Sequence, residues 1–348
     1  MVDFLIYFTL LLIISTLIPF IKKEYWIFRI FEYPRLQKLV LNLFCILIWL
    51  FYISIKEKFH VILLSLLILN AIYLIYLILP FTKLAKVQVH NTTKEIPENS
   101  ISLMIANVFQ DNNNYAGCLS EVAKANPDVL LLIEVNSEWE KATRELNKEY
   151  PFSIKIPLEN TYGMLLYSKF ELKDASIMYM VKDDIPSIHT KIILKNKQTI
   201  QLYAVHPMPP VPSENPSSAE RDKELLLVAD LAKKSKIPVI VIGDLNDVAW
   251  SFTTELFLKM SGLLDPRRGR GFFNTFHAHY PFLRFPLDHA FISVDLKLKT
   301  IKRLNNFKSD HFPMFIGLQY EEQAKFEQEE IKPDATDIET AEKKKNAV

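Results

Sequence analysis

Polar side chains that can do chemistry follow a series of apolar runs along this chain. Each run is rich in Val, Ile and Leu and closes on a residue that can bind a metal, a phosphate or a proton. The residues are Asn107, Glu134, His206, Asp244, Asn246 and Asp288, and the segment 307–313 (FKSDHFP) adds Asp310 and His311. One such run end is common in any protein, whereas an ordered series is hard to explain by packing alone. We therefore treat these side chains as one candidate site.

Three carboxylates in this series predict a site for a divalent cation. Glu134 closes VLLLIE, where a charge beside a buried strand must be solvated, paired or metal-bound. Asp244 follows VIVIG, and Asp310 stands directly before His311. Mg²⁺ and Mn²⁺ take hard oxygen ligands, one or two of them carboxylates, and keep waters or substrate phosphate. A solvated strand end is the alternative for any one of these residues alone.

Two histidines supply proton chemistry. His311 follows Asp310 directly, and Asp288 could orient its imidazole as a base–orienter pair. His206 ends the run LYAVH and could donate to a phosphate oxygen. A single histidine in such a place is usually structural, but its occurrence with several carboxylates favours an acid–base role.

A basic loop, DPRRGRGFFNTF, follows the second half of the series. Its Arg267, Arg268 and Arg270 stand beside Phe272 and Phe273. Arginines with neighbouring aromatic rings can hold phosphate and stack on a nucleobase. We therefore predict that Arg268 and Arg270 bind substrate, with a solvated loop as the alternative.

The first 82 residues predict a membrane anchor with three transmembrane helices. The apolar runs are 4–21, 39–55 and 61–81, and none contains Lys, Arg, Asp or Glu. Each is near the length of about 20 residues that crosses a bilayer as a helix. The alternative is a cleaved signal peptide followed by buried core helices, but the start MVDF lacks a basic region and no small-residue cleavage site follows.

The charged residues between these runs indicate on which side of the membrane the C-terminal part lies. The segment 22–38 carries Lys22, Lys23, Arg29, Arg35 and Lys38, interleaved with aromatic residues, which is typical of a membrane interface. The positive-inside rule puts this segment, and with three spans the C-terminal part, in the cytoplasm.

The opposite orientation stays open, because the short loop around Lys56 and Lys58 is also basic.

The rest of the chain predicts a catalytic domain at residues 101–320, joined to the anchor by a polar linker at 83–100. Short β-rich runs alternate with helical patterns at 115–125 and 221–234. The predicted strands are 101–108, 129–135, 163–167, 189–194, 199–205, 239–242, 289–293 and 314–318. This mixture predicts an α/β sandwich of two packed sheets covered by helices.

Residues 321–348 are polar and are expected to be a disordered tail, or else a segment that binds a partner.

Net charge and cysteine content exclude little. The formal net charge of +1 gives no argument for a polyanionic partner. Cys45 lies in an apolar run and Cys118 far from it, so a disulfide between them is not expected.

The order of the candidate residues, ending in Ser309-Asp310-His311, resembles the endonuclease/exonuclease/phosphatase superfamily over about residues 101–320. GDLN and SDHFP carry the resemblance most specifically. The three apolar runs, with NTYGMLLYS, DDIPSIH and GDLNDVAWS, resemble a bacterial membrane-anchored branch of it. The resemblance implies a four-layer α/β sandwich, Mg²⁺ or Mn²⁺, hydrolysis of a phosphate ester, and a multi-pass protein of the bacterial inner membrane.

The resemblance also implies a role for each residue. Glu134 would bind the metal, with Asn107 and Asp310 close to it. Asp244 would position or deprotonate the attacking water, and Asn246 would orient the phosphate. The further roles are charge stabilisation by His206, acid–base work by His311 held by Asp288, and phosphate binding by Tyr162. Whether the Asp or the His is the base stays open.

Three functions compete at this point. The first is a membrane-anchored nuclease, motivated by the arginine–aromatic loop. The second is a hydrolase of phospholipid or phosphosugar head groups, because a membrane-tethered site meets lipid at high local concentration. The third is a non-catalytic scaffold on the same fold. The expected partners are the phosphate-ester substrate and membrane lipid, and the sequence indicates no obligate protein partner.

Overall fold

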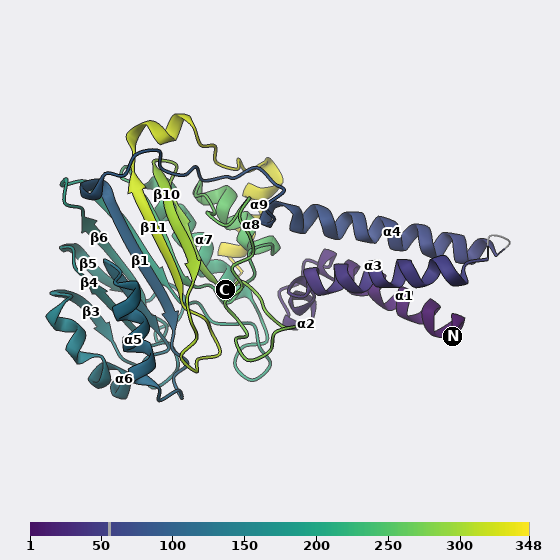
Figure 1. The fold of residues 1–348 in the computed structure, drawn as a ribbon, viewed down its shortest axis with the longest axis horizontal. Helices are drawn as coiled ribbons and strands as arrows, with labels where there is room; N and C mark the ends of the chain where they lie inside the picture. Colours follow the sequence, from purple (N-terminus) through teal and green to yellow (C-terminus); the bar gives the residue numbers. More distant parts are fainter. Residues whose placement is uncertain (55–56, 348) are drawn as a thin grey trace.

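The computed structural model describes residues 1–54 and 57–347 as a helical arm joined to a layered α/β domain (Figure 1). Ile55 and Lys56, which the sequence assigns to the end of the second apolar run and the loop after it, lie outside the described residues. The helices of the arm are α1 (Val2–Leu17), α2 (Trp26–Arg29), α3 (Arg35–Tyr52) and α4 (Lys58–Ile78).

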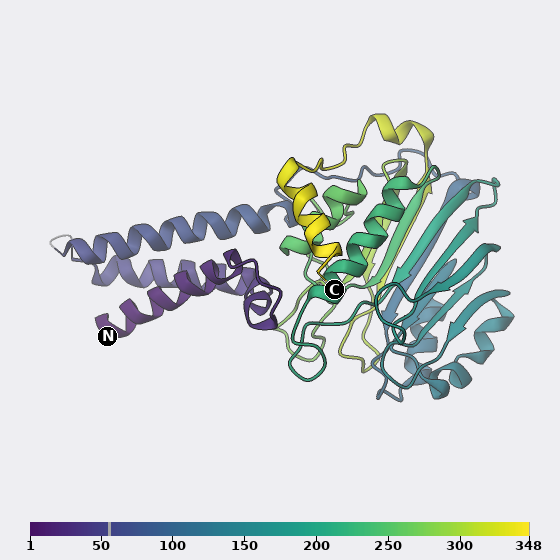
Figure 2. The ribbon, with the colours of Figure 1, turned by 180° about the vertical axis from the view of Figure 1, so that it is seen from behind.

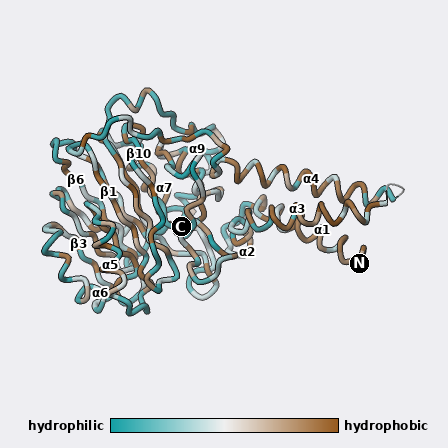
Figure 3. Tube along the Cα trace, viewed as in Figure 1, coloured by the Kyte–Doolittle hydropathy of each residue, from teal (hydrophilic) through white to brown (hydrophobic). Residues whose placement is uncertain are grey.

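The apolar helices of the arm pack on one another. Leu12, Cys45, Trp49 and Leu67 are buried between α1, α3 and α4, whereas most of the other apolar side chains point outward. Hydrophobic residues cover these helices along their length (Figure 3). All three are long and apolar enough to cross a membrane.

Two mixed sheets form the centre of the domain. The first has the strand order β10 (Leu296–Arg303), β11 (Met314–Tyr320), β1 (Ser100–Asn107), β2 (Val129–Ile133), β4 (Met164–Ser168) and β3 (Phe152–Ile156). The second has the order β5 (Leu172–Met178), β6 (Ser187–Ile193), β7 (Thr199–Val205), β8 (Val239–Asp244) and β9 (Asp288–Ile292). Their facing sides bury one apolar core, which includes Ile105, Leu131 and Ile240.

Helices cover the outer face of each sheet. On the first sheet, α5 (Tyr115–Ala125) and α6 (Ser137–Ala142) bury Val122 and Trp139. On the second, α7 (Ala219–Lys234) and α8 (Phe252–Ser261) bury Leu225 and Phe257. The order helix, sheet, sheet, helix confirms the predicted four-layer α/β sandwich. The remaining short turns are η1 (Ile18–Phe20), η2 (Ile30–Glu32), η3 (Leu79–Phe81), η4 (Pro97–Asn99), η5 (Arg144–Lys148) and η6 (Glu322–Phe326).

The prediction of a disordered tail is wrong for its last part. Residues Ala335–Lys345 form helix α9, which begins with a capping box at Asp334 and Asp337. Seen from behind, α9 lies beside α7 and α8 (Figure 2). Its apolar contact is small, with Ala341 buried against Leu226 and Leu256. The docking is mainly through charge, because the buried Lys344 ammonium lies 2.6 Å from Asp222 Oδ2 and 3.1 Å from Glu24 Oε1.

Candidate active site

The predicted site residues come from strand ends at one edge of the sandwich. Asn107 ends β1, Glu134 directly follows β2, and Asp244 ends β8. Because β1 and β2 run parallel, as do β7 and β8, their carboxyl ends meet at the same edge. Asp288 opens β9 and stands opposite Asp244 in the register. The fold therefore brings together side chains that are far apart in the sequence.

A glycine lets β8 approach β7 directly before Asp244. Gly243 has φ +150°, and a Cβ there would lie 1.8 Å from the carbonyl oxygen of Val205. Only glycine fits this close approach, so the position of the Asp244 carboxylate depends on it.

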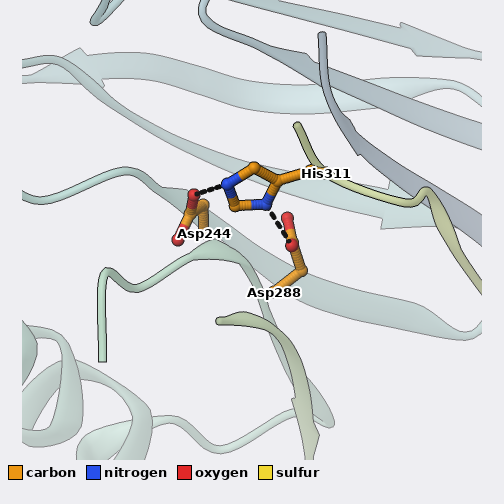
Figure 4. A group of neighbouring side chains, drawn as sticks. All are labelled: Asp244, Asp288 and His311. Atoms are coloured by element: carbon orange, nitrogen blue, oxygen red, sulfur yellow. Dashed lines mark hydrogen bonds and ion pairs between the residues drawn. The ribbon is translucent and has the colours of Figure 1, made fainter. Parts of the chain in front are cut away.

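His311 stands between two carboxylates at the centre of this edge (Figure 4). Its Nδ1 lies 2.8 Å from Asp288 Oδ2, and its Nε2 lies 3.5 Å from Asp244 Oδ2. Burial alone would lower the pKa of this imidazole, but the two carboxylates override that effect and raise the pKa to about 10. The ring is therefore held as an imidazolium that hydrogen-bonds to Asp288 through Nδ1 and forms a longer ion pair with Asp244 through Nε2.

Asn107 links this ion pair to Glu134. Its Nδ2 donates to Glu134 Oε1 at 2.7 Å and to Asp244 Oδ2 at 3.1 Å, while its Oδ1 accepts the Phe109 N–H. The amide of Asn107 thus orients two carboxylates, and its predicted place close to the metal stays a prediction.

Negative charge at Glu134 is only partly compensated by the chain. Burial raises the pKa of this carboxyl to about 7, and the hydrogen bond from Asn107 and the charge on His311 offset only part of that effect. The charge of half-buried Asp310 raises the pKa of Glu134 further. A divalent cation would relieve this repulsion, so the oxygen donors of Glu134 and Asp310 fit one.

A second group with metal-ligand chemistry consists of Asp244, Asp288 and His311, whose ligand atoms lie within 4.8 Å of one another. This acidic and histidine cluster could hold a metal ion by composition. Its ligand atoms already bond to one another, so a cation there would have to displace the His311 contacts.

His206 and Tyr162 form the far wall of the site. Their rings lie 5.4 Å apart between centroids, and both residues are buried. Among the described residues, His206 Nδ1, Tyr162 Oη and Asp288 Oδ1 have no hydrogen-bond partner. Since buried polar atoms are normally paired, His206 Nδ1 and Tyr162 Oη are suited to contact the oxygens of a bound phosphate, whereas the Asp288 carboxylate acts on His311. Their predicted roles stay predictions.

Asn246, in the loop that follows β8, contacts three other segments of the chain. Its Nδ2 donates to Pro207 O at 3.0 Å, and its backbone N–H donates to Asp244 Oδ1 at 2.9 Å. Its carbonyl oxygen accepts from Tyr33 Oη and Arg221 Nη1, both at 2.8 Å. The position of this residue is therefore fixed from several sides.

The structure does not bring Arg268 and Arg270 to this site. Arg268 pairs with Glu255 of α8, and its guanidinium stacks on the Phe81 ring. Arg270 donates to Val89 O and Asn91 Oδ1 of the linker. Both side chains are occupied by structural contacts, so the substrate-binding role predicted for them is not supported.

Several residues that sequence patterns do not single out support the site. Thr275 Oγ1 accepts the Asp288 N–H at 3.2 Å, and Ser309 Oγ donates to Asn107 O at 2.8 Å. Tyr33 reaches Asn246 from the arm. Only Ser309 carried a signal, as part of the SDHFP motif.

Comparisons with known proteins agree with this arrangement. A model of the Endonuclease/Exonuclease/phosphatase family matches residues 104–311, more than half of the chain. A search of curated proteins gave no match.

Solved structures share the fold at low sequence identity. A D. rerio TDP2 humanized by 14 mutations aligns with TM-score 0.53 and 15% identity, covering 64% of this chain and 99% of that one. The human Nocturnin catalytic domain with bound sulfate aligns with TM-score 0.52 and 17% identity, covering 64% of this chain and 95% of that one. A mannosyl-6-phosphatase from Bacteroides thetaiotaomicron aligns with TM-score 0.51 and 15% identity, covering 63% of this chain and 100% of that one.

Proposed function

Because the chain belongs to the endonuclease/exonuclease/phosphatase family, we propose that it is a divalent-cation-dependent phosphoester hydrolase held in a membrane by its three apolar helices. The observation that carries the proposal is His311, fixed between Asp288 and Asp244 at the strand edge that also holds Glu134. A scaffold would not need a buried imidazolium beside three buried polar atoms that lack partners.

The geometry favours Asp244 as the proton acceptor. As an imidazolium, His311 carries a proton on both ring nitrogens and so has no free lone pair with which to take another. Asp244 Oδ2 faces Asn107 and His311, whereas Oδ1 accepts the Asn246 N–H and keeps a lone pair that can take a proton. In this mechanism Asp244 takes the proton of the attacking water as the new oxygen–phosphorus bond forms and the ester bond breaks.

The remaining residues stabilise charge on the phosphoryl group. The His311 imidazolium and the free Tyr162 hydroxyl and His206 ring nitrogen can donate to oxygens that gain charge in the transition state. Glu134 and Asp310 would hold Mg²⁺ or Mn²⁺, which supplies Lewis-acid stabilisation of the phosphoryl oxygen when bound. The site thus meets the electrostatic needs of phosphoester hydrolysis with groups already oriented.

A nuclease, the first of the three predicted functions, loses one of the observations that motivated it. That observation was the basic loop with Arg268 and Arg270, which contact Glu255 and the linker instead of the catalytic edge. A lipid or phosphosugar ester is the other substrate class, and the three apolar helices favour it because they would hold the site close to lipid.

The test is hydrolysis of a soluble phosphodiester by the purified full chain. Bis(p-nitrophenyl) phosphate should be hydrolysed with Mg²⁺ and not after chelation by EDTA. Asp244→Asn and His311→Gln should each lower kcat by about 10²-fold or more. Turnover that survives EDTA, or that is unchanged in Asp244→Asn, would contradict the proposal.

A titration tests the metal residues separately. Glu134→Gln and Asn107→Ala should each raise the Mg²⁺ concentration needed for half-maximal activity, for Asn107→Ala by about 10–100-fold, because it orients the Glu134 carboxylate. An exposed control, Glu145→Gln, should leave the titration unchanged.

A further inference from the structure

The arm packs directly on the loop between β8 and α8, which carries Asn246 and Trp250. Besides the bond from Tyr33 to Asn246, Trp250 Nε1 donates to Glu32 O at 2.9 Å, and Arg35 donates back to Trp250 O. Phe81, Trp250 and Phe285 share one buried apolar cluster with these contacts. The arm therefore fixes how the catalytic edge is oriented relative to the apolar helices.

A loop at residues 277–284 leaves the domain beside the catalytic histidine. The Phe276 ring lies 5.0 Å from the His311 ring between centroids, and Ala278 N donates to Asp310 O at 2.6 Å. The loop returns at Phe285, which pairs with Phe276 as an antiparallel bridge. The base of this loop is thus part of the wall of the site.

The tip of the same loop touches the start of an apolar helix of the arm. Gln37, in the first turn of α3, donates from Nε2 to the carbonyl oxygen of Phe282 at 2.9 Å. One turn further along α3, the outward-facing apolar side chains begin with Val40. If α3 crosses a bilayer, the tip of the 277–284 loop lies where the hydrocarbon region begins.

The tip is apolar and exposed. Phe282 is 87% exposed, Tyr280 58% and Leu283 53%. The segment around α2, at the junction of arm and domain (Figure 1), exposes Tyr25, Ile27 and Ile30 in the same way. Aromatic and aliphatic side chains exposed beside a membrane-spanning helix are typical of a segment that lies in the membrane interface.

Two cations stand behind the tip. The guanidinium of Arg284, at the end of the loop, lies 4.9 Å from the centroid of the Phe312 ring, and that of Arg303, at the end of β10, lies 4.2 Å from it. Phe312 directly follows His311 in the chain. A phosphate held near the membrane surface would find positive charge between the apolar tip and the catalytic histidine.

We propose that the 277–284 loop inserts its tip into the lipid surface and that the catalytic edge hydrolyses the phosphate ester of a membrane phospholipid whose acyl chains stay in the bilayer. This inference rests on the phosphoester hydrolase function proposed above. It assigns the substrate class through the loop that joins the site to the membrane boundary.

The depth of the loop tip can be measured without knowing the reaction. A spin label on Phe282→Cys is compared with one on Phe326→Cys, in η6, which is 76% exposed. The full chain is placed in nanodiscs of phosphatidylcholine and phosphatidylglycerol, and the native Cys45 and Cys118 are both buried. We expect oxygen to collide with the label at 282 more than a water-soluble nickel chelate does, with the opposite order at 326. A water-exposed label at 282 would overturn the insertion.

Kinetics test the substrate class. The double variant Phe282→Asp, Leu283→Asp should lose at least about tenfold in the release of head group from the same nanodiscs, because two apolar anchors are lost. Its turnover of soluble bis(p-nitrophenyl) phosphate should match the parent, as should both activities of Phe326→Asp. Parent chain that hydrolyses the soluble ester or single-stranded DNA but releases no head group would overturn the inference and leave the hydrolase function standing. Failure on every substrate would overturn both.

Discussion

A buried imidazole between two carboxylates is held in one protonation state by its surroundings. At His311 the Asp288 contact of 2.8 Å is the shorter and better oriented of the two, because Asp288 meets Nδ1 while its own backbone N–H is held by Thr275. An amide in place of the Asp288 carboxylate would remove the charge and leave the shape.

We expect Asp288→Asn to lower kcat on a soluble phosphodiester by about 10²–10⁴-fold, because the orientation and charge of His311 are both lost. KM should change little, since Asp288 does not need to touch the substrate for this effect. Steady-state kinetics check the prediction, with the exposed Asp183→Asn as a control that should behave like the parent. A loss confined to KM would contradict it.

A second titrating residue, remote from the site, links pH to stability. Burial raises the pKa of Glu224, on α7, from 4.5 to about 8. The folded chain then holds a proton that the unfolded chain releases, so stability is full below about pH 4.5 and is lost as the pH rises through about 8.

Glu224→Gln should remove this pH dependence. Between about pH 5 and pH 8 the parent should lose on the order of a few kcal/mol of unfolding free energy that the variant keeps. Denaturant unfolding of the full chain at both pH values measures the difference. Glu145→Gln, at an exposed position, should follow the parent, and a parent that is equally stable at both values would exclude the effect.

At the scale of elements, the sequence predicted the buried strands and the residues that follow them. β1, β2 and β8 are almost wholly apolar, and a polar residue after such a run marks a strand end whatever the rest of the fold does. The edge strand β5 was missed because nearly all its side chains are exposed and its sequence carries no apolar pattern. The contact of Tyr33 with Asn246 was missed because no local pattern reports a pairing across 213 positions.

Helix α9 was missed for a different reason. Its composition is polar, and the apolar area that it buries is small, so a rule based on hydrophobic burial predicts disorder. The helix is held instead by ion pairs, of which the buried pair of Lys344 with Asp222 is the most enclosed. Ion pairs between distant segments leave no periodic signal in the sequence.

Removing one partner of that pair should show what it contributes. Lys344→Ala leaves the buried Asp222 with Arg221 as its ion-pair partner and Ser218 as a hydrogen-bond donor, so it should cost about 1.5–3 kcal/mol of unfolding free energy. The neighbouring Lys343 makes an exposed pair with Glu339, so Lys343→Ala should cost less than about 1 kcal/mol. Denaturant unfolding compares the two variants, and equal costs would show that α9 is only loosely docked.

At the scale of the whole molecule, the arm and the domain form one packed body. Residues on both sides of the linker contribute to the apolar cluster around Trp250, and Glu24 of the arm shares Lys344 with Asp222 of the domain. A flexible tether would make no such contacts. The arm therefore packs against the domain on both sides of the linker.

We expect the fragment 86–347 to fold less stably and to work less well than the full chain. Without Tyr33 and Glu32 the loop that carries Asp244 and Asn246 loses its supports, and a small displacement there should lower kcat/KM on a soluble phosphodiester by about 10–100-fold. Trp250 should enter water, so tryptophan emission should shift to longer wavelength, since the fragment's other tryptophan, Trp139, lies buried under the first sheet. The melting temperature should fall by several degrees, measured against the full chain in the same detergent. A fragment with the emission, melting temperature and kcat/KM of the full chain would show instead that the arm only tethers the enzyme, and the orientation of the site toward the bilayer would then need another cause.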